Sequence, residues 1–331
     1  MKPGFGLLCA EEAQRLSRRH RAVQTTKMQL DNKLMSMHEA ISRYVHDGDV
    51  IVIEGFTHLI CFAAAHEIIR QRRRDLTVCR LTPDLIYDQL IGAGCVRRLV
   101  FSWAGNPGAG PLYALRRAVE QGIPNPIELE EYSHFGMVAR LTAGASRLPF
   151  YPLRNYMGSD LPRVNPRIKT ITCPFTGEDL AAVPALNPDT AIVHAQRADE
   201  NGNAQIWGLL GVQKEAAFAA KHTIVVAEEI VPEKTIRDDP NRTLIPGLIV
   251  DAVVNEPFGC HPSYAQGFYD RDNNFYVKWR DTSADVRRFN EYLEEWVFGV
   301  ADRAEYISRA GDSLARLRAG THLCEPVNYG Y

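Results

Sequence analysis

The sequence predicts an α/β protein with an open, largely parallel sheet that carries helices on both faces. Short apolar runs of strand length, such as "VIVI" at 50–53, alternate with longer amphipathic segments such as "FAAAHEIIRQ" at 62–71. Strands that are apolar on both faces are typical of buried parallel sheets. A strand–helix–strand order also implies right-handed crossovers between parallel strands.

Composition restricts the class of protein. The chain has 331 residues, is 45% hydrophobic and has a formal net charge of −2, so it has no general attraction to nucleic acid or to an anionic membrane. Its seven scattered cysteines include no CxxC pair, which indicates no metal site and is typical of a reducing cytoplasm. No apolar run reaches the ~18–20 residues of a membrane span. We therefore expect a soluble, cytoplasmic protein.

The first predicted element follows a polar, basic stretch. We interpret residues 1–34 as an N-terminal extension and residues 35–331 as a single domain. A helix is predicted in "SMHEAISRYVHDGD", where Ser36 and Glu39 have capping-box spacing and Gly48 is expected to end the helix. Four apolar residues of this segment share one face: Ala40, Ile41, Tyr44 and Val45.

The alternation of elements continues to the end of the chain. After 50–53, strands are expected at 76–81, 97–101, 126–132, 168–173, 189–196, 223–231 and 248–254. Helices are expected at 62–71, 85–91, 111–122, 135–145 and 214–221, and amphipathic helices within 283–319. Since ligands of such sheets bind beyond the carboxyl ends of the strands, the loops there are the candidate sites.

Two glycine-containing loops follow predicted strands. In "EGFTHL" (54–59), Gly55 permits a sharp turn, and the amides after it could bind an anion or a developing oxyanion. A purely structural glycine is the alternative. The loop "SWAGNPGAGP" (102–111) lacks the Lys-Ser/Thr of a P-loop and the order of a GxGxxG motif, so it is interpreted as a ligand-contacting loop and not as a nucleotide site.

Two other loops contain histidines. In "EEYSHFG", Ser133 suits a helix cap, and His134 is either a proton-transfer group or a bystander. In "EPFGCHPS", Cys260 and His261 are adjacent, and adjacent side chains in an extended segment point in opposite directions. That pair is therefore not expected to form a thiol-protease site.

Five segments, in order, resemble the A subunits of class I coenzyme A transferases, glutaconate CoA-transferase above all. "DGDVIVIEGF" matches the signature that runs Asp-Gly, two variable residues, three apolar residues and Gly-Gly-Phe. The other matching segments are "RLPFYPLR", "AIVHAQRADENGNAQIWG", "IVVAEEIV" and "VDAVVNEPFGCHPS". The resemblance covers roughly residues 35–310 and implies the open α/β sheet of the CoA-transferase/NagB-RpiA-like fold.

The resemblance implies an enzyme that moves CoA between an acyl-CoA and a carboxylic acid by a ping-pong route. The nucleophile of the family is a Glu on a partner B subunit, which forms a glutamyl-CoA thioester. A heterodimer or A2B2 heterotetramer is therefore expected, with CoA as a substrate and no permanently bound cofactor. Three residues carry over as catalytic candidates: Gly55, Phe56 and His134. Five carry over as substrate or CoA-binding candidates: Glu54, Thr57, Asn106, Gly108 and Ser133.

The chain departs from the family pattern in ways that leave the reaction open. Glu54 replaces the first signature glycine and so places a carboxyl beside the expected oxyanion site, and His134 stands where relatives have Gln or Glu. Alternatives are therefore an acyl-CoA hydrolase or decarboxylase/lyase on the same scaffold, or a non-catalytic ligand-sensing domain.

The stretch "ADENGNAQ" contains a possible decoy. Its Glu200-Asn201-Gly202 matches the B-subunit nucleophile motif by letters alone. Because Asp199, Asn201 and Gly202 are strong turn formers, a hairpin with Glu200 in solvent is expected, and the nucleophile is expected on the partner.

Overall fold

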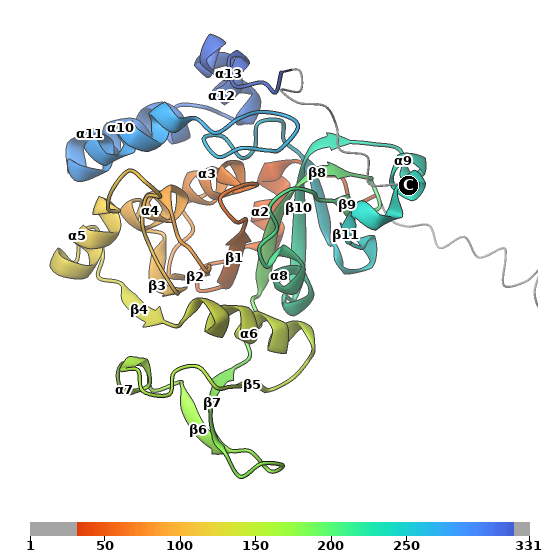
Figure 1. Cartoon of the computed structure of the whole chain (residues 1–331). Coiled ribbons are helices and arrows are strands. Elements are labelled where there is room, and N and C mark those ends of the chain that lie inside the picture. Colours follow the sequence, from red (N-terminus) through yellow and green to blue (C-terminus); the bar gives the residue numbers. More distant parts are fainter. Residues whose placement is uncertain (1–31, 321–331) are drawn as a thin grey trace, which may run out of the picture. The chain divides into compact units, whose positions relative to one another are not determined.

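The main sheet is built from parallel strands in the order β12-β10-β8-β1-β2-β3-β4 (Figure 1). The computed structural model describes residues 32–320, and the chain from Lys33 onward forms one compact unit. Within this unit, the parallel strands are β1 (Val50–Glu54), β2 (Leu76–Cys79), β3 (Val96–Phe101), β4 (Glu128–Glu131), β8 (Thr190–Ala198), β10 (His222–Ile230) and β12 (Ala252–Asn255). The short strands β9 (Ala204–Gln205) and β11 (Thr243–Ile245) extend the sheet in antiparallel fashion beside β8.

Helices cover both faces of the sheet, because alternate strand residues face opposite ways. Ile51 and Ile53 pack in one core cluster with α2 (Met37–Tyr44), α3 (Phe62–Arg70), α4 (Leu85–Gly92), α5 (Tyr113–Gln121), α10 (Asn273–Ala284) and α11 (Val286–Leu293). Val52 packs in another cluster with α6 (His134–Ala145) and α8 (Gln213–Ala219). The predicted largely parallel, doubly covered α/β sheet is confirmed.

The first helix confirms the predicted cap but ends earlier than expected. Ser36 accepts from the Glu39 amide and Glu39 accepts from the Ser36 amide, which completes the capping box. The helix stops at Tyr44, four residues before Gly48. Asp49 accepts a hydrogen bond from the His46 amide at 2.7 Å, and this side-chain bond favours a turn over further helix.

A second, smaller sheet was not foreseen. The strand expected at 168–173 is β6 (Lys169–Thr172), and it belongs to an antiparallel sheet in the order β5-β7-β6, with β5 (Phe150–Leu153) and β7 (Asp179–Pro184). The predicted strand was correct, but its placement in the parallel sheet was wrong. The short helix α7 (Leu161–Val164) lies between β5 and β6 in the chain.

The remaining segments connect and follow β10 and β12. The segment expected as a strand at 248–254 begins with a 3-10 turn, η2 (Gly247–Ile249), and only its end is β12. Between β10 and η2 lie α9 (Glu233–Asp238), η1 (Pro240–Arg242) and β11. After α11 come the π-helical turn η3 (Glu294–Phe298), α12 (Arg303–Ala310) and α13 (Asp312–Ala315). None of the helices described is long and apolar enough to span a membrane.

The direction of the strand order reverses between β1 and β8. The chain passes from β1 through β2 and β3 to β4 on one side, and it later adds β8, β10 and β12 on the other side. Open α/β sheets bind ligands at such a switch point, beyond the carboxyl ends of the strands. Glu54, the last residue of β1, lies there and pairs with Val193 of β8.

Lys33 and Leu34 join the edge of the sheet. Leu34 forms a parallel bridge with Val253 of β12, and the Lys33 carbonyl accepts from the Val253 amide at 2.9 Å. Lys33 also donates its amide to the Glu200 carbonyl at 3.2 Å and its Nζ to the Gly247 carbonyl at 2.6 Å. The contacts of the compact unit therefore begin two residues before Met35.

Two truncations test where the extension ends. A chain that starts at Asn32 keeps all of these contacts and is the reference. A chain that starts at Met35 loses the three hydrogen bonds of Lys33, so its free energy of unfolding should fall by about 1–3 kcal/mol. Urea unfolding of both variants measures the difference. Equal stability of the two would show that the Lys33 contacts contribute nothing.

Candidate functional site at the carboxyl ends of β1 to β4

The loop after β1 makes a tight turn that only glycine can begin. A Cβ on Gly55 would lie 2.5 Å from the Leu59 carbonyl oxygen and 2.7 Å from that of His58. Thr57 and Leu59 both have positive φ, 59° and 56°, which is uncommon for residues with a Cβ and marks backbone strain held by the surroundings. No backbone carbonyl of the described residues accepts from the amide of Phe56 or Thr57. Binding of an anion or oxyanion by these amides stays a prediction.

The loop 261–264 holds this turn in place. The Leu59 amide donates to the Tyr264 carbonyl at 2.9 Å, and the Ser263 hydroxyl donates to the Thr57 carbonyl at 3.0 Å. Two of the loops selected from the sequence thus lie side by side. As expected, Cys260 and His261 have separate surroundings, since the His261 ring contacts the Tyr306 hydroxyl at 2.8 Å and Asp272 at 3.2 Å.

A buried arginine fixes the carbonyl side of the Gly55 turn. Arg80, just after β2, donates Nη2 to the Gly55 carbonyl at 2.5 Å and Nη1 to Asp84 at 3.2 Å. Both charged side chains are almost fully buried. This pair was not predicted from the sequence. An Arg that directly follows an apolar strand, with an Asp four residues later, was the signal that could have revealed it.

Glu54 lies beneath the turn and out of solvent. Its carboxyl is 1% exposed, and its Oε2 has no hydrogen-bond partner among the described residues. Burial raises the pKa of Glu54 to about 7, while the nearby Arg80 opposes the rise and Asp84 and Glu215 add to it. A Cβ on Gly211 would lie 3.2 Å from Glu54 Oε1 and 2.9 Å from the Phe56 Cβ. The acid that replaces the signature glycine is therefore a buried group with a neutral-range pKa.

His134 and Phe56 meet at the carboxyl edge. Their rings lie edge to face, with centroids 6.4 Å apart, and His134 is exposed. Its Nδ1 lies 2.9 Å from the hydroxyl of Ser102, which follows β3. Ser102 belongs to the loop 102–111 but was not among the site residues predicted from the sequence. The structure therefore brings together the predicted residues Gly55, Phe56 and His134.

Ser133 caps the helix that begins at His134. Its hydroxyl accepts from the Gly136 amide at 3.0 Å and from the Asn155 side chain at 2.8 Å. Gly136 is itself constrained, because a Cβ there would lie 1.7 Å from the Tyr156 hydroxyl. A ligand-binding role for Ser133 stays a prediction beside this observed cap.

The loop 102–111 packs on α10. Asn106 is buried and donates Nδ2 to the Tyr276 carbonyl at 2.7 Å, while its Oδ1 has no protein partner among the described residues. Arg271 donates to the Pro107 carbonyl at 3.2 Å. Gly108 is exposed with φ 76° and open space around it. Asn106 thus has an anchoring contact, and binding roles for Asn106, Gly108 and the exposed Thr57 stay predictions.

Glu200 lies in the predicted hairpin turn. β8 and β9 pair as Arg197↔Gln205 and Ala198↔Ala204. The Asp199 side chain accepts from the amides of Asn201 and Asn203 and from the Asn203 side chain, and Gly202 has φ 92°. Glu200 is exposed. It lies seven residues beyond Val193, so at about 3.3 Å per residue it is roughly 20 Å from Glu54 along the sheet.

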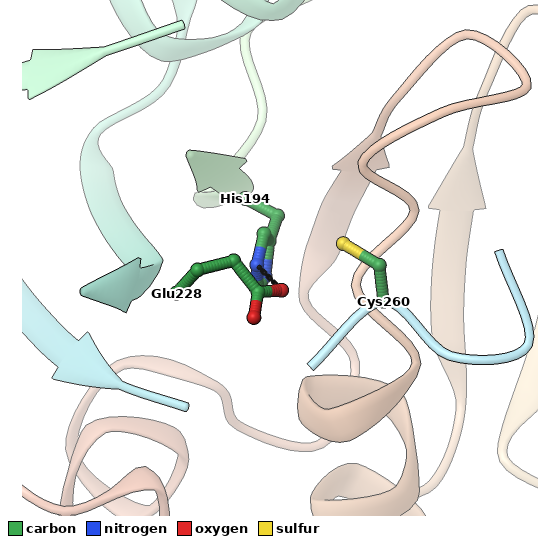
Figure 2. Close-up of side chains that lie close together, drawn as sticks. All are labelled: His194, Glu228 and Cys260. Atoms are coloured by element: carbon green, nitrogen blue, oxygen red, sulfur yellow. Dashed lines mark hydrogen bonds and ion pairs between the residues drawn. The ribbon is translucent and has the colours of Figure 1, made fainter. Parts of the chain in front are cut away.

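A second buried cluster joins His194, Glu228 and Cys260, the residue just before the loop 261–264 (Figure 2). Their possible metal-ligand atoms all lie within 4.8 Å of one another. Glu228 nevertheless already accepts His194 Nε2 at 2.8 Å, the Tyr269 hydroxyl at 2.5 Å and the Phe258 amide at 2.7 Å. Burial also raises the pKa of the Cys260 thiol well above its ordinary value. We therefore interpret the cluster as a hydrogen-bonded support for the loop after β12.

Comparison with known proteins identifies the family. Residues 34–256 match the family model described as Coenzyme A transferase. The chain belongs to the coenzyme A transferase family. It is 52% identical to the A subunit of 3-oxoadipate CoA-transferase from Pseudomonas knackmussii over 280 residues, which cover 85% of this chain and 99% of that one.

Two further relatives agree with this assignment. The A subunit of glutaconate CoA-transferase from Acidaminococcus fermentans is 36% identical over 298 residues, covering 85% of this chain and 92% of that one. The crystal structure of that enzyme matches with a TM-score of 0.82 over 87% and 96% of the two chains. A structure of the decarboxylase AibA/AibB matches with a TM-score of 0.68 at 30% identity, over 79% and 98%. The predicted similarity to class I CoA-transferase A subunits is confirmed.

The buried Glu54 of this CoA-transferase chain should make stability depend on pH. Its pKa is about 7 in the folded protein and 4.5 as a free side chain, so between these values the folded protein binds more protons than the unfolded chain. The free energy of unfolding contributed by Glu54 therefore falls as pH rises through this window. Glu54→Gln removes the titration.

Unfolding of wild type and Glu54→Gln at about pH 5 and about pH 8 tests this. We expect the variant to gain roughly 2–3 kcal/mol relative to wild type between these two pH values. A difference in stability that does not change with pH would show that Glu54 ionises in the folded protein as it does in water.

Proposed function

We propose that the chain is the A subunit of a heteromeric CoA-transferase whose nucleophilic Glu lies on a B subunit. The observation that carries this proposal is a preformed Gly55–Phe56 turn whose own carboxyl, Glu54, is buried. Within the described residues, the carboxyl at the turn is Glu54, which is buried, and Glu200 is roughly 20 Å away along the sheet. A nucleophile from another chain completes such a site.

The proposed reaction proceeds by a ping-pong route. The partner's Glu carboxylate attacks the acyl-CoA carbonyl, and the CoA thiolate leaves as an acyl-glutamyl anhydride forms. The thiolate then attacks the glutamyl carbonyl, which gives a glutamyl-CoA thioester and frees the first acid. A second carboxylate reverses these steps and departs as its CoA ester. In this proposal, the amides of Phe56 and Thr57 stabilise the oxyanion that develops at each attack.

The proposed substrates are an acyl-CoA and a short dicarboxylic acid. The names of the two CoA-transferase relatives specify 3-oxoadipate and glutaconate, and both are dicarboxylates. CoA then serves as a substrate and is not a resident cofactor. We further propose an A/B heterodimer or A2B2 assembly in the cytoplasm, in line with the free cysteines of the described residues.

A second candidate reaction is hydrolysis or decarboxylation of an acyl-CoA. The match to the AibA/AibB decarboxylase supports the capacity of the scaffold for it, and the His134 imidazole beside Phe56 could hold a proton of an attacking water. The reaction products separate the two.

Reconstitution with a B subunit tests the proposed function. The chain alone should be inactive, and with a B subunit that carries a Glu-X-Gly motif it should exchange CoA between succinyl-CoA and a C5 or C6 dicarboxylate. Chromatography of the CoA esters measures exchange. Glu200→Ala serves as the control variant and should keep most activity, while hydroxylamine trapping should label the B subunit. Free acid without exchange would support a hydrolase, and labelling of Glu200 would contradict the hairpin interpretation.

Replacement of His134 should affect turnover more than stability. His134→Ala should lower kcat/KM for thioester hydrolysis at least tenfold, because loss of a proton-transfer group typically lowers rates by about 10²–10⁴-fold, with little change in Tm because the side chain is exposed. His134→Gln should retain transfer better than hydrolysis, since transfer between a carboxylate and a thiolate takes no proton from the attacking group. Wild-type kinetics with a lowered Tm would instead assign His134 a structural role.

A further inference from the structure

The Ser102 hydroxyl lies between two groups that compete for its single proton. Its Oγ is 2.5 Å from the Leu81 carbonyl oxygen and 2.9 Å from His134 Nδ1. The three residues follow β2, β3 and β4, the neighbouring strands whose carboxyl ends form the site. Leu81 is held in place, because its carbonyl also accepts the backbone amides of Ser102 and Trp103.

The hydrogen-bond donors and acceptors of Leu81, Ser102 and His134 determine where each proton lies. A carbonyl oxygen only accepts, and a serine hydroxyl has one proton to donate. Two oxygens 2.5 Å apart need a proton between them, so Ser102 donates to Leu81. The lone pair of Ser102 then faces His134, and the bond at 2.9 Å requires that Nδ1 carry a proton. Neutral His134 is therefore the Nδ1–H tautomer, and its Nε2 is an acceptor.

The second ring nitrogen of His134, Nε2, belongs to the same site as the Gly55 turn. Among the described residues, the hydrogen bond of the His134 side chain uses Nδ1 only, and the ring lies edge to face with Phe56. A neutral imidazole in this tautomer cannot donate through Nε2 to an acyl carbonyl. It can accept from a hydrogen-bond donor, such as a thiol, an amide N–H or a water.

We propose that Ser102 is a positioning residue that holds His134 in the Nδ1–H tautomer and so makes Nε2 the proton acceptor of the acyl site. The role of the site in this inference rests on the proposed function. The hydrogen-bond pattern of Ser102 and His134 does not depend on it. When water attacks the thioester, one of its protons passes to Nε2 as the C–O bond forms and the C–S bond breaks. Nε2 then returns that proton to the leaving CoA thiolate.

The tautomer is tested by nitrogen NMR of the A/B complex with 15N-labelled histidine. His134→Gln identifies the His134 signals, because they disappear in that variant. At about pH 9, wild type should show a protonated Nδ1 and a bare Nε2. Ser102→Ala should shift the signals toward the Nε2–H form, and Ser102→Thr, which keeps the hydroxyl, should restore the wild-type pattern. A wild-type Nε2–H tautomer would overturn the proposal.

The positioning role is tested by a double-mutant cycle. Ser102→Ala should lower kcat/KM roughly three- to tenfold, as expected for loss of one neutral hydrogen bond, and should lower thioester hydrolysis more than CoA exchange. Combined with His134→Ala, it should cause no further loss, because Ser102 acts through His134. Additive losses would overturn the positioning role. A complex that shows the Nδ1–H signals but catalyses neither exchange nor hydrolysis would contradict the proposed function. It would leave the tautomer assignment intact.

Discussion

The buried guanidinium of Arg80 is the interaction on which the geometry of the site depends. A charge without solvent is costly unless it is paired and hydrogen-bonded. Arg80 is paired with the Asp84 carboxylate and donates to the Gly55 carbonyl, while its Nε has no hydrogen-bond partner among the described residues. The turn after β1 and the start of α4 must therefore lie where this side chain can reach both the carboxylate and the carbonyl. The positive φ values of Thr57 and Leu59 are tolerated because the turn is held from this side and from the loop 261–264.

The same ion pair accounts for Glu54, the main departure from the family signature. Asp84 already neutralises Arg80 at 3.2 Å, so the nearby Glu54 gains too little from the guanidinium to offset its own burial, and its pKa rises to about 7. The carboxyl that appeared from the sequence to oppose an oxyanion is thus partly neutral near pH 7. The conflict between Glu54 and the expected chemistry is smaller than the residue types alone suggested.

The parts of the fold and site that were predicted correctly depend on local signals. Apolar strand runs identified the parallel sheet, and the glycine of "EGFTHL" identified the turn at its carboxyl edge. Ser102 was missed because its partners Leu81 and His134 are 21 and 32 residues away in sequence. The strand at β6 was recognised but assigned to the wrong sheet, because an isolated strand pattern does not specify its neighbours.

The sequence by itself determined the alternation of strands and helices, the family, and the hairpin at Glu200, because Asp199, Asn201 and Gly202 form that turn through bonds within a few residues. Only the tertiary structure decided that Glu54 is buried, that Arg80 holds the Gly55 turn, and which nitrogen of His134 carries the proton. Burial and hydrogen-bond partners are contributed by residues distant in the chain. The sequence therefore specifies which groups are present, while the packing of the loops specifies the protonation and the neighbours of those groups.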